Sequence, residues 1–177
     1  MVMPFSFDQW ERYYQHMETP SLSQLKKELS LLPSKEIVEI CMKLARYKKE
    51  NKELLHYLLY HAGDEKNYIK TVKKEITLLF MECNTNTVYL AKKSIRKILN
   101  TTNKYIKYSK LKQTEVELRI YFCTELKNSG MLIYTGISLN NLYDRQICNI
   151  KKALETLHED LQHDYLEELK LVTYTLK

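Results

Sequence analysis

Histidines beside carboxylates give this sequence its first candidate chemistry. His158 and His163 enclose the segment Glu-Asp-Leu-Gln, and His56 and His61 repeat the same spacing of five residues. Zinc sites on helices instead use two histidines four residues apart, because that spacing puts both rings on one face. A spacing of five turns the second ring by about 140°. The sequence therefore predicts surface histidines, with no bound metal and no cofactor.

Nucleophilic catalysis has no better support. A cysteine nucleophile needs a base beside it, and Cys148 lies ten residues before His158 on one expected helix. That separation is about 15 Å along a helix axis. With three Gly in 177 residues, the sequence also lacks the glycine-rich loops that hold phosphates. We therefore expect a protein that is not an enzyme.

The four cysteines contain no CxxC pair, which leaves a zinc knuckle or a thioredoxin-type site without local support. They predict reduced thiols that behave as small apolar side chains in a reducing compartment.

The distribution of charge is the strongest functional signal. The chain has 28 basic and 22 acidic residues, a net charge of +6. Residues 70–112 contain eleven basic and two acidic residues, a net charge of +9, whereas residues 144–168 have a net charge of −4. The acidic segment could face the basic one either within the molecule or across a dimer.

The basic side chains of residues 87–100 fall on one arc of the expected helix, opposite its apolar side chains. Lysine there can neutralise phosphates, and tyrosine can stack on bases. The alternative interpretation is a solvated face, because lysine outnumbers arginine in this chain and arginine is favoured for bidentate contacts. The candidate binding face consists of Tyr89, Lys92, Lys93, Arg96, Lys97, Lys104, Tyr105, Lys107 and Tyr108.

Hydrophobic periodicity predicts that helices position these side chains. Ser21 and Gln24 form a capping box, and Ser34 and Asp64 are expected to cap two later helices. Gly63 is expected to end a helix as its C′ residue. The sequence predicts helices over residues 21–32, 87–100, 113–128, 139–158 and 161–174.

Two segments are less regular. Residues 101–112 are polar and basic, with at most a short helix, and residues 129–138 are the one place where a strand could form. Short connections imply antiparallel neighbours. The fold class is therefore predicted as all-α, with seven to eight antiparallel helices. We expect a helical-hairpin array (an α-α superhelix, HEAT-like) rather than a closed bundle.

The sequence predicts an aromatic N-terminal arm over residues 1–20 and a single helical domain over residues 21–177. The arm places Trp10, Tyr13 and Tyr14 on one helical face, where they would cap the domain's own core or dock on a second copy; capping is our expectation. No stretch reaches the roughly 18 apolar residues of a membrane span, and no secretory signal is recognised. We expect a cytoplasmic protein.

A family resemblance covers residues 23–175. The segments 23–40 (SQLKKELSLLPSKEIVEI) and 51–59 (NKELLHYLL) resemble the opening of an uncharacterised bacterial all-helical family. The segment 90–98 (LAKKSIRKI) resembles the next basic helix of that family. The resemblance implies an all-helical fold and a bacterial source, and it supplies no site residues.

These observations favour a non-enzymatic helical interaction module that binds a protein partner or a second copy of itself. The alternative is nucleic-acid binding through the basic segment 70–112. Lysines that converge on one concave face would favour nucleic acid, and lysines scattered over several faces would disfavour it.

Overall fold

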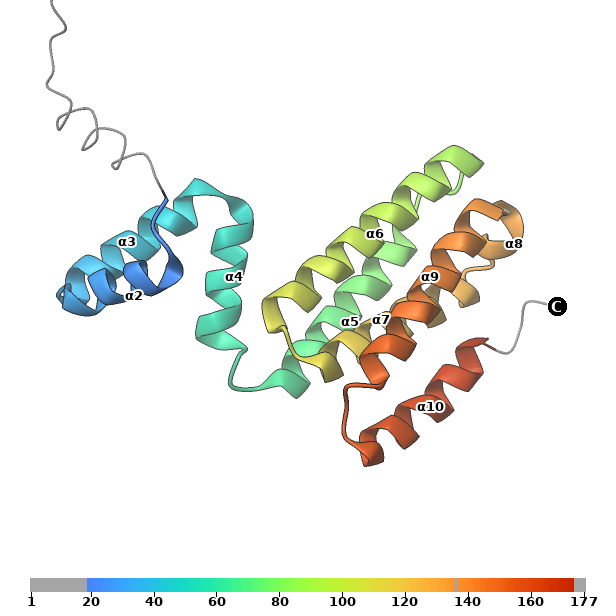
Figure 1. The fold of residues 1–177 in the computed structure, drawn as a ribbon. Helices are drawn as coiled ribbons and strands as arrows, with labels where there is room; N and C mark the ends of the chain where they lie inside the picture. Colours follow the sequence, from blue (N-terminus) through green and yellow to red (C-terminus); the bar gives the residue numbers. More distant parts are fainter. Residues whose placement is uncertain (1–18, 136, 174–177) are drawn as a thin grey trace, which may run out of the picture. The chain divides into compact units, whose positions relative to one another are not determined.

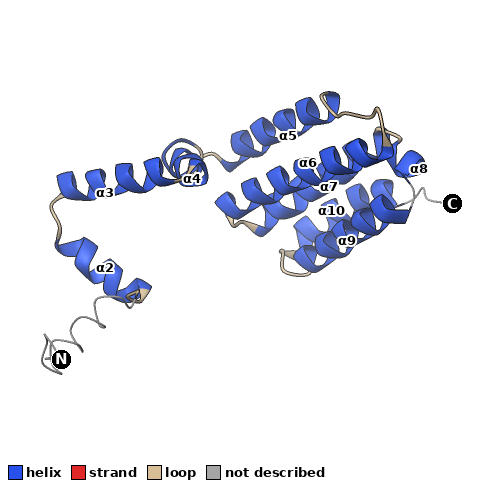
Figure 2. Ribbon diagram, turned by 90° about the horizontal axis from the view of Figure 1, so that it is seen from above, coloured by secondary structure: helices blue, strands red, loops and turns tan. Residues whose placement is uncertain are grey.

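The computed structural model describes residues 19–135 and 137–173, and every regular element in these ranges is an α-helix (Figures 1 and 2). This confirms the predicted all-α class and is compatible with a helical-hairpin array. The predicted aromatic arm falls outside the described residues, apart from its last two residues, Thr19 and Pro20. The helices are α2 (Leu22–Leu31), α3 (Ser34–Tyr47), α4 (Lys49–Tyr60), α5 (Glu65–Met81), α6 (Val88–Ser109), α7 (Lys112–Asn128), α8 (Met131–Thr135), α9 (Ile137–Leu154) and α10 (Glu159–Thr173).

The aromatic residues of the arm, among them Trp10, Tyr13 and Tyr14, lie outside the described residues. The expected roles of the arm's aromatic rings therefore stay predictions.

The chain forms two compact units, one ending at Lys52 and the other beginning at Glu53. The single helical domain that the sequence predicts over residues 21–177 stays a prediction. Among the described residues of the first unit only Ala45 is buried, so its helices share little core. The apolar side chains that these helices expose include Leu22, Leu31, Val38, Leu44 and Tyr47.

Capping in the first unit follows the sequence at one helix and departs from it at the next. The Ser21 hydroxyl accepts a hydrogen bond from the Gln24 backbone N–H, and Gln24 Oε1 accepts one from the Ser21 backbone N–H (2.8 Å). This confirms the predicted capping box. The expected Ser34 cap is wrong: Pro33 is the N-cap of α3, and Ser34 is the first helical residue.

The core of the second unit is built around α7, which packs against α5, α6, α8, α9 and α10. Its side chains Val116, Leu118, Phe122 and Leu126 are fully buried. They point to several sides of the helix, because α7 has neighbours around most of its circumference. The predicted helix over residues 113–128 is confirmed.

Consecutive long helices of the second unit are antiparallel, so alternate ones run in the same direction (Figure 1). Lys73 contacts Glu117 and Thr77 contacts Tyr121, so α5 and α7 are parallel. Tyr165 also contacts Glu117, and Lys127 contacts the Leu171 carbonyl, so α10 is parallel to both. The helix α7 lies between α5 and α10.

The basic residues after position 100 continue the helix α6. The expected break after residue 100 is wrong, because α6 runs to Ser109 and buries Thr102, Ile106 and Tyr108. The Thr102 hydroxyl donates to the Ile98 carbonyl at 3.0 Å, which lets this polar residue lie in the core. Lys110 then ends the helix in the left-handed conformation (φ 60°).

Glycine and strand predictions need two further corrections. Gly63 is not a left-handed C′ residue; among the described glycines only Gly130 has a positive φ (68°). Residues 131–135 form the helix α8, with Met131 and Leu132 buried, and no strand occurs in the described part of the chain. The apolar run that resembled a strand is therefore a short helix, which buries Met131 and Leu132 and exposes Ile133. The Asp64 cap of α5 is confirmed, since its side chain accepts from the Asn67 backbone N–H.

Candidate interaction surfaces

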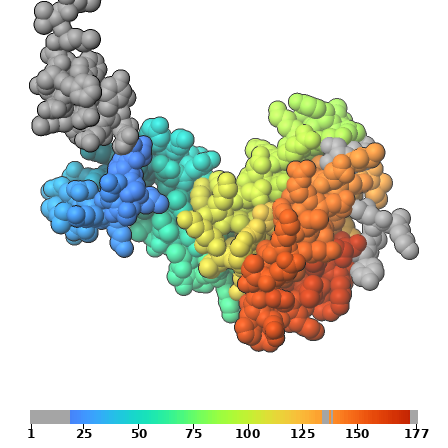
Figure 3. All heavy atoms as spheres, in the orientation of Figure 1, coloured from blue at the N-terminus to red at the C-terminus, as the bar shows by residue number. Residues whose placement is uncertain are grey.

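The predicted basic face divides into an outer and an inner part. On the outside of α6, Tyr89 is 72% exposed, and Lys92 is half-buried. This helix lies at the surface of the second unit (Figure 3). The exposed part, called the α6 stripe below, consists of Tyr89, Lys93, Arg96, Lys97 and Lys107.

The other three predicted residues bind carboxylates of their own chain. Lys104 Nζ lies 2.6 Å from Glu53, and the Tyr108 hydroxyl donates to the same carboxylate at 2.9 Å. The Tyr105 hydroxyl donates to Glu75 at 2.7 Å. Burial, reinforced by the Glu75 carboxylate, raises the pKa of Tyr105. These groups hold helices together and present no open phosphate site.

Tyrosine–glutamate hydrogen bonds recur between the other helices. The Tyr57 hydroxyl donates to Glu65 at 2.9 Å, and Glu65 also accepts from the hydroxyls of Ser109 and Thr114. One carboxylate thus joins α4, α6 and α7 to the start of α5. Ser109 and Thr114 are 44 and 49 residues from Glu65 in the sequence, so no local pattern reveals these two partners.

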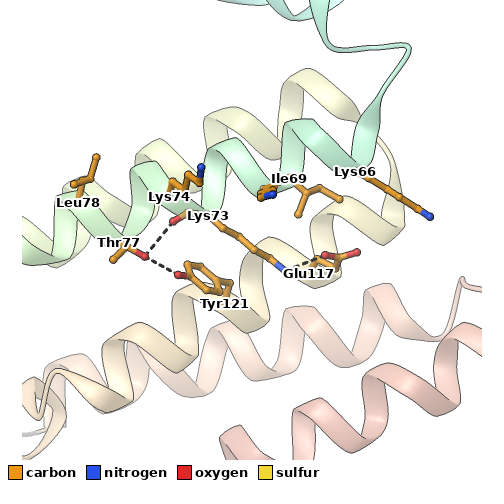
Figure 4. Close-up of a pocket in the computed structure, with 9 residues that line it drawn as sticks. Lys66, Ile69, Lys73, Lys74, Thr77, Leu78, Glu117 and Tyr121 are labelled. Atoms are coloured by element: carbon orange, nitrogen blue, oxygen red, sulfur yellow. Dashed lines mark hydrogen bonds and ion pairs between the residues drawn. The ribbon is translucent and has the colours of Figure 1, made fainter.

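A groove of about 620 Å³ lies between α5 and α7 (Figure 4). Four lysines of α5 line it, and the apolar side chains of Ile69 and Leu78 and the ring of Tyr121 form much of the remaining lining. We call this feature the lysine groove. Its basic residues are Lys66, Lys70, Lys73 and Lys74.

One lysine of the groove is fixed and the other three are available. Lys73 reaches across to Glu117 at 3.0 Å and lies 5.6 Å from the centre of the Tyr121 ring (Figure 4). Thr77 and Tyr121 share a hydrogen bond of 2.6 Å. The other three lysines of the groove are exposed and have no carboxylate partner among the described residues: Lys66, Lys70 and Lys74.

Sequence reasoning did not identify this groove. Lys66 lies before the predicted basic segment, and the other three lysines lie within it but outside the predicted face. The available signal is the spacing of four residues from Lys66 to Lys70 to Lys74, which puts them in one row. The groove is lined by α5 and α7 and not by α6, so the basic residues occupy two separate surfaces rather than one concave face.

A second groove, of about 280 Å³, lies between α7 and α10 and is lined partly by Glu168 and Leu171. Asp160 and Asp164 precede Glu168 in steps of four residues, and all three are exposed. We call these three residues the acidic stripe. The neighbouring Glu167 is already paired with Lys170 at 2.5 Å, and this hydrogen bond lowers the pKa of the Glu167 carboxyl.

The four histidines that the structure describes do not gather into a metal site. His158 Nδ1 lies 3.4 Å from Asp160, and His163 Nδ1 lies 4.0 Å from Asp164, so each faces a near neighbour in the sequence. The rings of His56 and His61 do meet, with centroids 5.0 Å apart. Within the described ranges, no group of three histidine, cysteine or acidic side chains is placed to hold an ion.

In residues 19–135 and 137–173, none of the helices combines the length and the apolar character that a bilayer span requires. No protein-family model, curated protein or solved structure matches this chain. The resemblance of residues 23–175 to a bacterial helical family therefore stays a prediction.

Proposed function

We propose that this protein is a non-enzymatic interaction module whose lysine groove binds an acidic, amphipathic helix of a protein partner. The observation that carries the proposal is the combination of an apolar lining with a row of available ammonium groups. Lys66, Lys70 and Lys74 repeat every four residues, which matches carboxylates on one face of a helix. Ile69 and Leu78 would contact the apolar face of the same ligand.

The apolar part of the lining favours protein over nucleic acid at this groove. The available lysines would attract carboxylates and phosphates alike, and Glu117 is already paired with Lys73 at 3.0 Å, so charge does not decide between the two ligands. Apolar contacts between lysine stems and Leu78, which is 57% exposed, suit leucine or isoleucine side chains. An acidic amphipathic helix satisfies both features.

Peptide binding tests the proposal. The probe is a designed helical peptide with leucine along one face and glutamate beside it, compared with the same peptide carrying lysine for glutamate. We expect fluorescence anisotropy to show binding of the acidic peptide alone. The variant Lys66→Glu, Lys70→Glu, Lys74→Glu should lose this binding. The matched control Lys93→Glu, Lys97→Glu, Lys107→Glu has the same change in charge on α6 and should keep it.

Equal binding of the two peptides, or unchanged binding by the α5 variant, would overturn the proposal. Circular dichroism of both variants checks that each remains helical.

Nucleic-acid binding is the second candidate, and the α6 stripe is the observation that favours it. Tyr89 is 72% exposed among exposed cations, as a base-stacking side chain beside phosphate contacts would be. Binding to mixed-sequence DNA and RNA should weaken steeply between about 50 and about 200 mM salt. In this assay the roles of the two variants are exchanged, because the α6 variant should lose binding and the α5 variant should keep it.

The proposal includes a cytoplasmic location and a bacterial helical-repeat protein. The four cysteines are unpaired thiols in the described residues, which suits a reducing compartment. Fractionation of cells that express the tagged chain would test the location.

A further inference from the structure

The lysine groove and the acidic stripe have the same spacing. The groove offers Lys66, Lys70 and Lys74, and the stripe on α10 offers Asp160, Asp164 and Glu168. Both rows advance by four residues and span about 12 Å along their helices. Each therefore presents three charges of one sign at matching intervals.

Both rows flank α7 on the same face of the second unit. Glu117 of α7 accepts from Lys73 on one side at 3.0 Å and from the Tyr165 hydroxyl on the other at 2.7 Å. The two grooves that border α7 are lined from α5 and from α10 respectively. The acidic stripe thus lies across α7 from the lysine row and cannot fill the groove of its own chain.

A two-fold rotation about an axis along α7 exchanges these flanks between two copies. Because α5, α7 and α10 are parallel, the rotation lays α10 of one copy beside α5 of the other in the same direction. Lys73 and Tyr165 share the level of Glu117, so the two rows are staggered by two residues, about 3 Å or roughly half a helical turn. A lysine side chain can span that offset.

Apolar side chains accompany the charges. Leu78 follows the lysine row and is 57% exposed, and Leu171 follows the acidic row and is 75% exposed. In the parallel arrangement both leucines lie beyond the same end of the paired rows. Their burial would add a contribution that salt does not screen.

We infer that α10 of a second copy is the acidic helix that the lysine groove binds, so that two chains form a symmetric dimer. This inference rests on the proposed function, because it names the ligand of the same groove. In a closed, two-fold dimer the contact between a lysine row and an acidic row occurs twice, and no charged row is left over for a third copy.

Sedimentation velocity over a range of concentrations tests the dimer. We expect a reversible dimer whose dissociation constant rises roughly tenfold between about 50 and about 300 mM salt, because exposed ion pairs are screened. Two variants are compared, each of which reverses the charge of one row. The groove variant carries Lys66→Glu, Lys70→Glu and Lys74→Glu, and the helix variant carries Asp160→Lys, Asp164→Lys and Glu168→Lys.

Each variant alone should be monomeric, because like charges then meet at both contacts. An equal mixture should form a heterodimer, because the acidic groove of one now faces the basic helix of the other. The α6 control, Lys93→Glu, Lys97→Glu, Lys107→Glu, should dimerise like the wild type.

The outcomes separate this inference from the proposed function. A wild-type chain that stays monomeric at about 1 mM and low salt, but still binds the acidic peptide, overturns the dimer and leaves the groove's function standing. Failure of the peptide to bind removes the proposed function as well. A dimer that persists in both variants, or a mixture that stays monomeric, places the contact elsewhere and overturns the inference.

Discussion

Tyr165 donates a hydrogen bond of 2.7 Å to Glu117 and thereby joins α10 to α7. The same hydroxyl accepts from Gln113 at 3.0 Å, so one phenol connects two side chains of α7. Burial raises the pKa of Tyr165, and the hydrogen bond to Glu117 reinforces that shift. This contact helps to fix the position of α10, and with it the acidic stripe, together with the hydrogen bonds of Lys127 and Tyr143 to the backbone of α10.

Removing the Tyr165 hydroxyl should destabilise the second unit. In Tyr165→Phe, Glu117 keeps Lys73 but loses its second partner, and Gln113 loses an acceptor. We expect the free energy of unfolding in urea to fall by about 1–2 kcal/mol. Tyr89→Phe is the control, because its hydroxyl is exposed, and should change stability by less than about 0.5 kcal/mol. Equal effects of the two substitutions would contradict the structural role of Tyr165.

Glu65 should be more sensitive than a surface glutamate. A glutamine at this position keeps the shape but exchanges one acceptor oxygen for a donor NH₂ group. The three hydroxyls of Tyr57, Ser109 and Thr114 can then no longer all donate to it. We expect Glu65→Gln to lower the free energy of unfolding by about 1–3 kcal/mol. The exposed Glu155→Gln is the comparison, and a loss of similar size there would refute this account.

Alkaline pH should unfold the second unit through its tyrosines. Burial is the first cause that raises the pKa of Tyr57, Tyr68, Tyr105, Tyr143 and Tyr165. A raised pKa in the folded state means that the neutral phenol favours folding. This contribution to stability is complete below the pKa of about 10 that tyrosine has in the unfolded chain. It is lost as the pH rises through the higher pKa values of the folded state.

The measurement is the phenolate absorbance of the native and the denatured chain. At about pH 11, four phenols of the native chain, those of Tyr68, Tyr105, Tyr143 and Tyr165, should still be protonated and should ionise when denaturant is added. A native titration curve that matches the denatured one would rule out buried, neutral phenols.

The four cysteines should react with a thiol reagent at different rates. Burial raises the pKa of the Cys123 thiol to about 12, and its side chain is fully buried. Cys148 is exposed, so it departs from the expectation that every cysteine behaves as a core side chain. We expect Cys148 to be modified first and Cys123 only after unfolding. Mass spectrometry of the labelled peptides checks this order, and early modification of Cys123 would contradict the structure.

Local signals predict helices well where the cap and the apolar stripe agree. Ser21 and Gln24 show this for α2, and Asp64 for α5. The length of α6 escaped prediction because Thr102 counts as polar although its hydroxyl is bonded within the helix. Spacing also could not separate Lys93, which is exposed, from Lys104, which binds Glu53 on another helix.

The lysine groove was out of reach for a related reason. The four-residue spacing of its lysines is visible in the sequence, but Glu117 and Tyr121 come from a helix 44 residues away from their partners Lys73 and Thr77. Only packing decides which face of α5 meets α7. The identity of a groove is therefore a tertiary property, even where the charges that line it form a regular local pattern.

The shared direction of α5, α7 and α10 has an electrical consequence. The macrodipoles of these three helices add, and the long helices α6 and α9 oppose them. The net dipole of the five long helices is therefore about that of a single helix, equivalent to roughly half an elementary charge at each end. Glu65, Glu115 and Glu159 lie in the first turns of the three parallel helices, and Lys127 and Lys170 lie in the last turns of two of them. These side chains place countercharges at both ends and so offset the polarity that the topology creates.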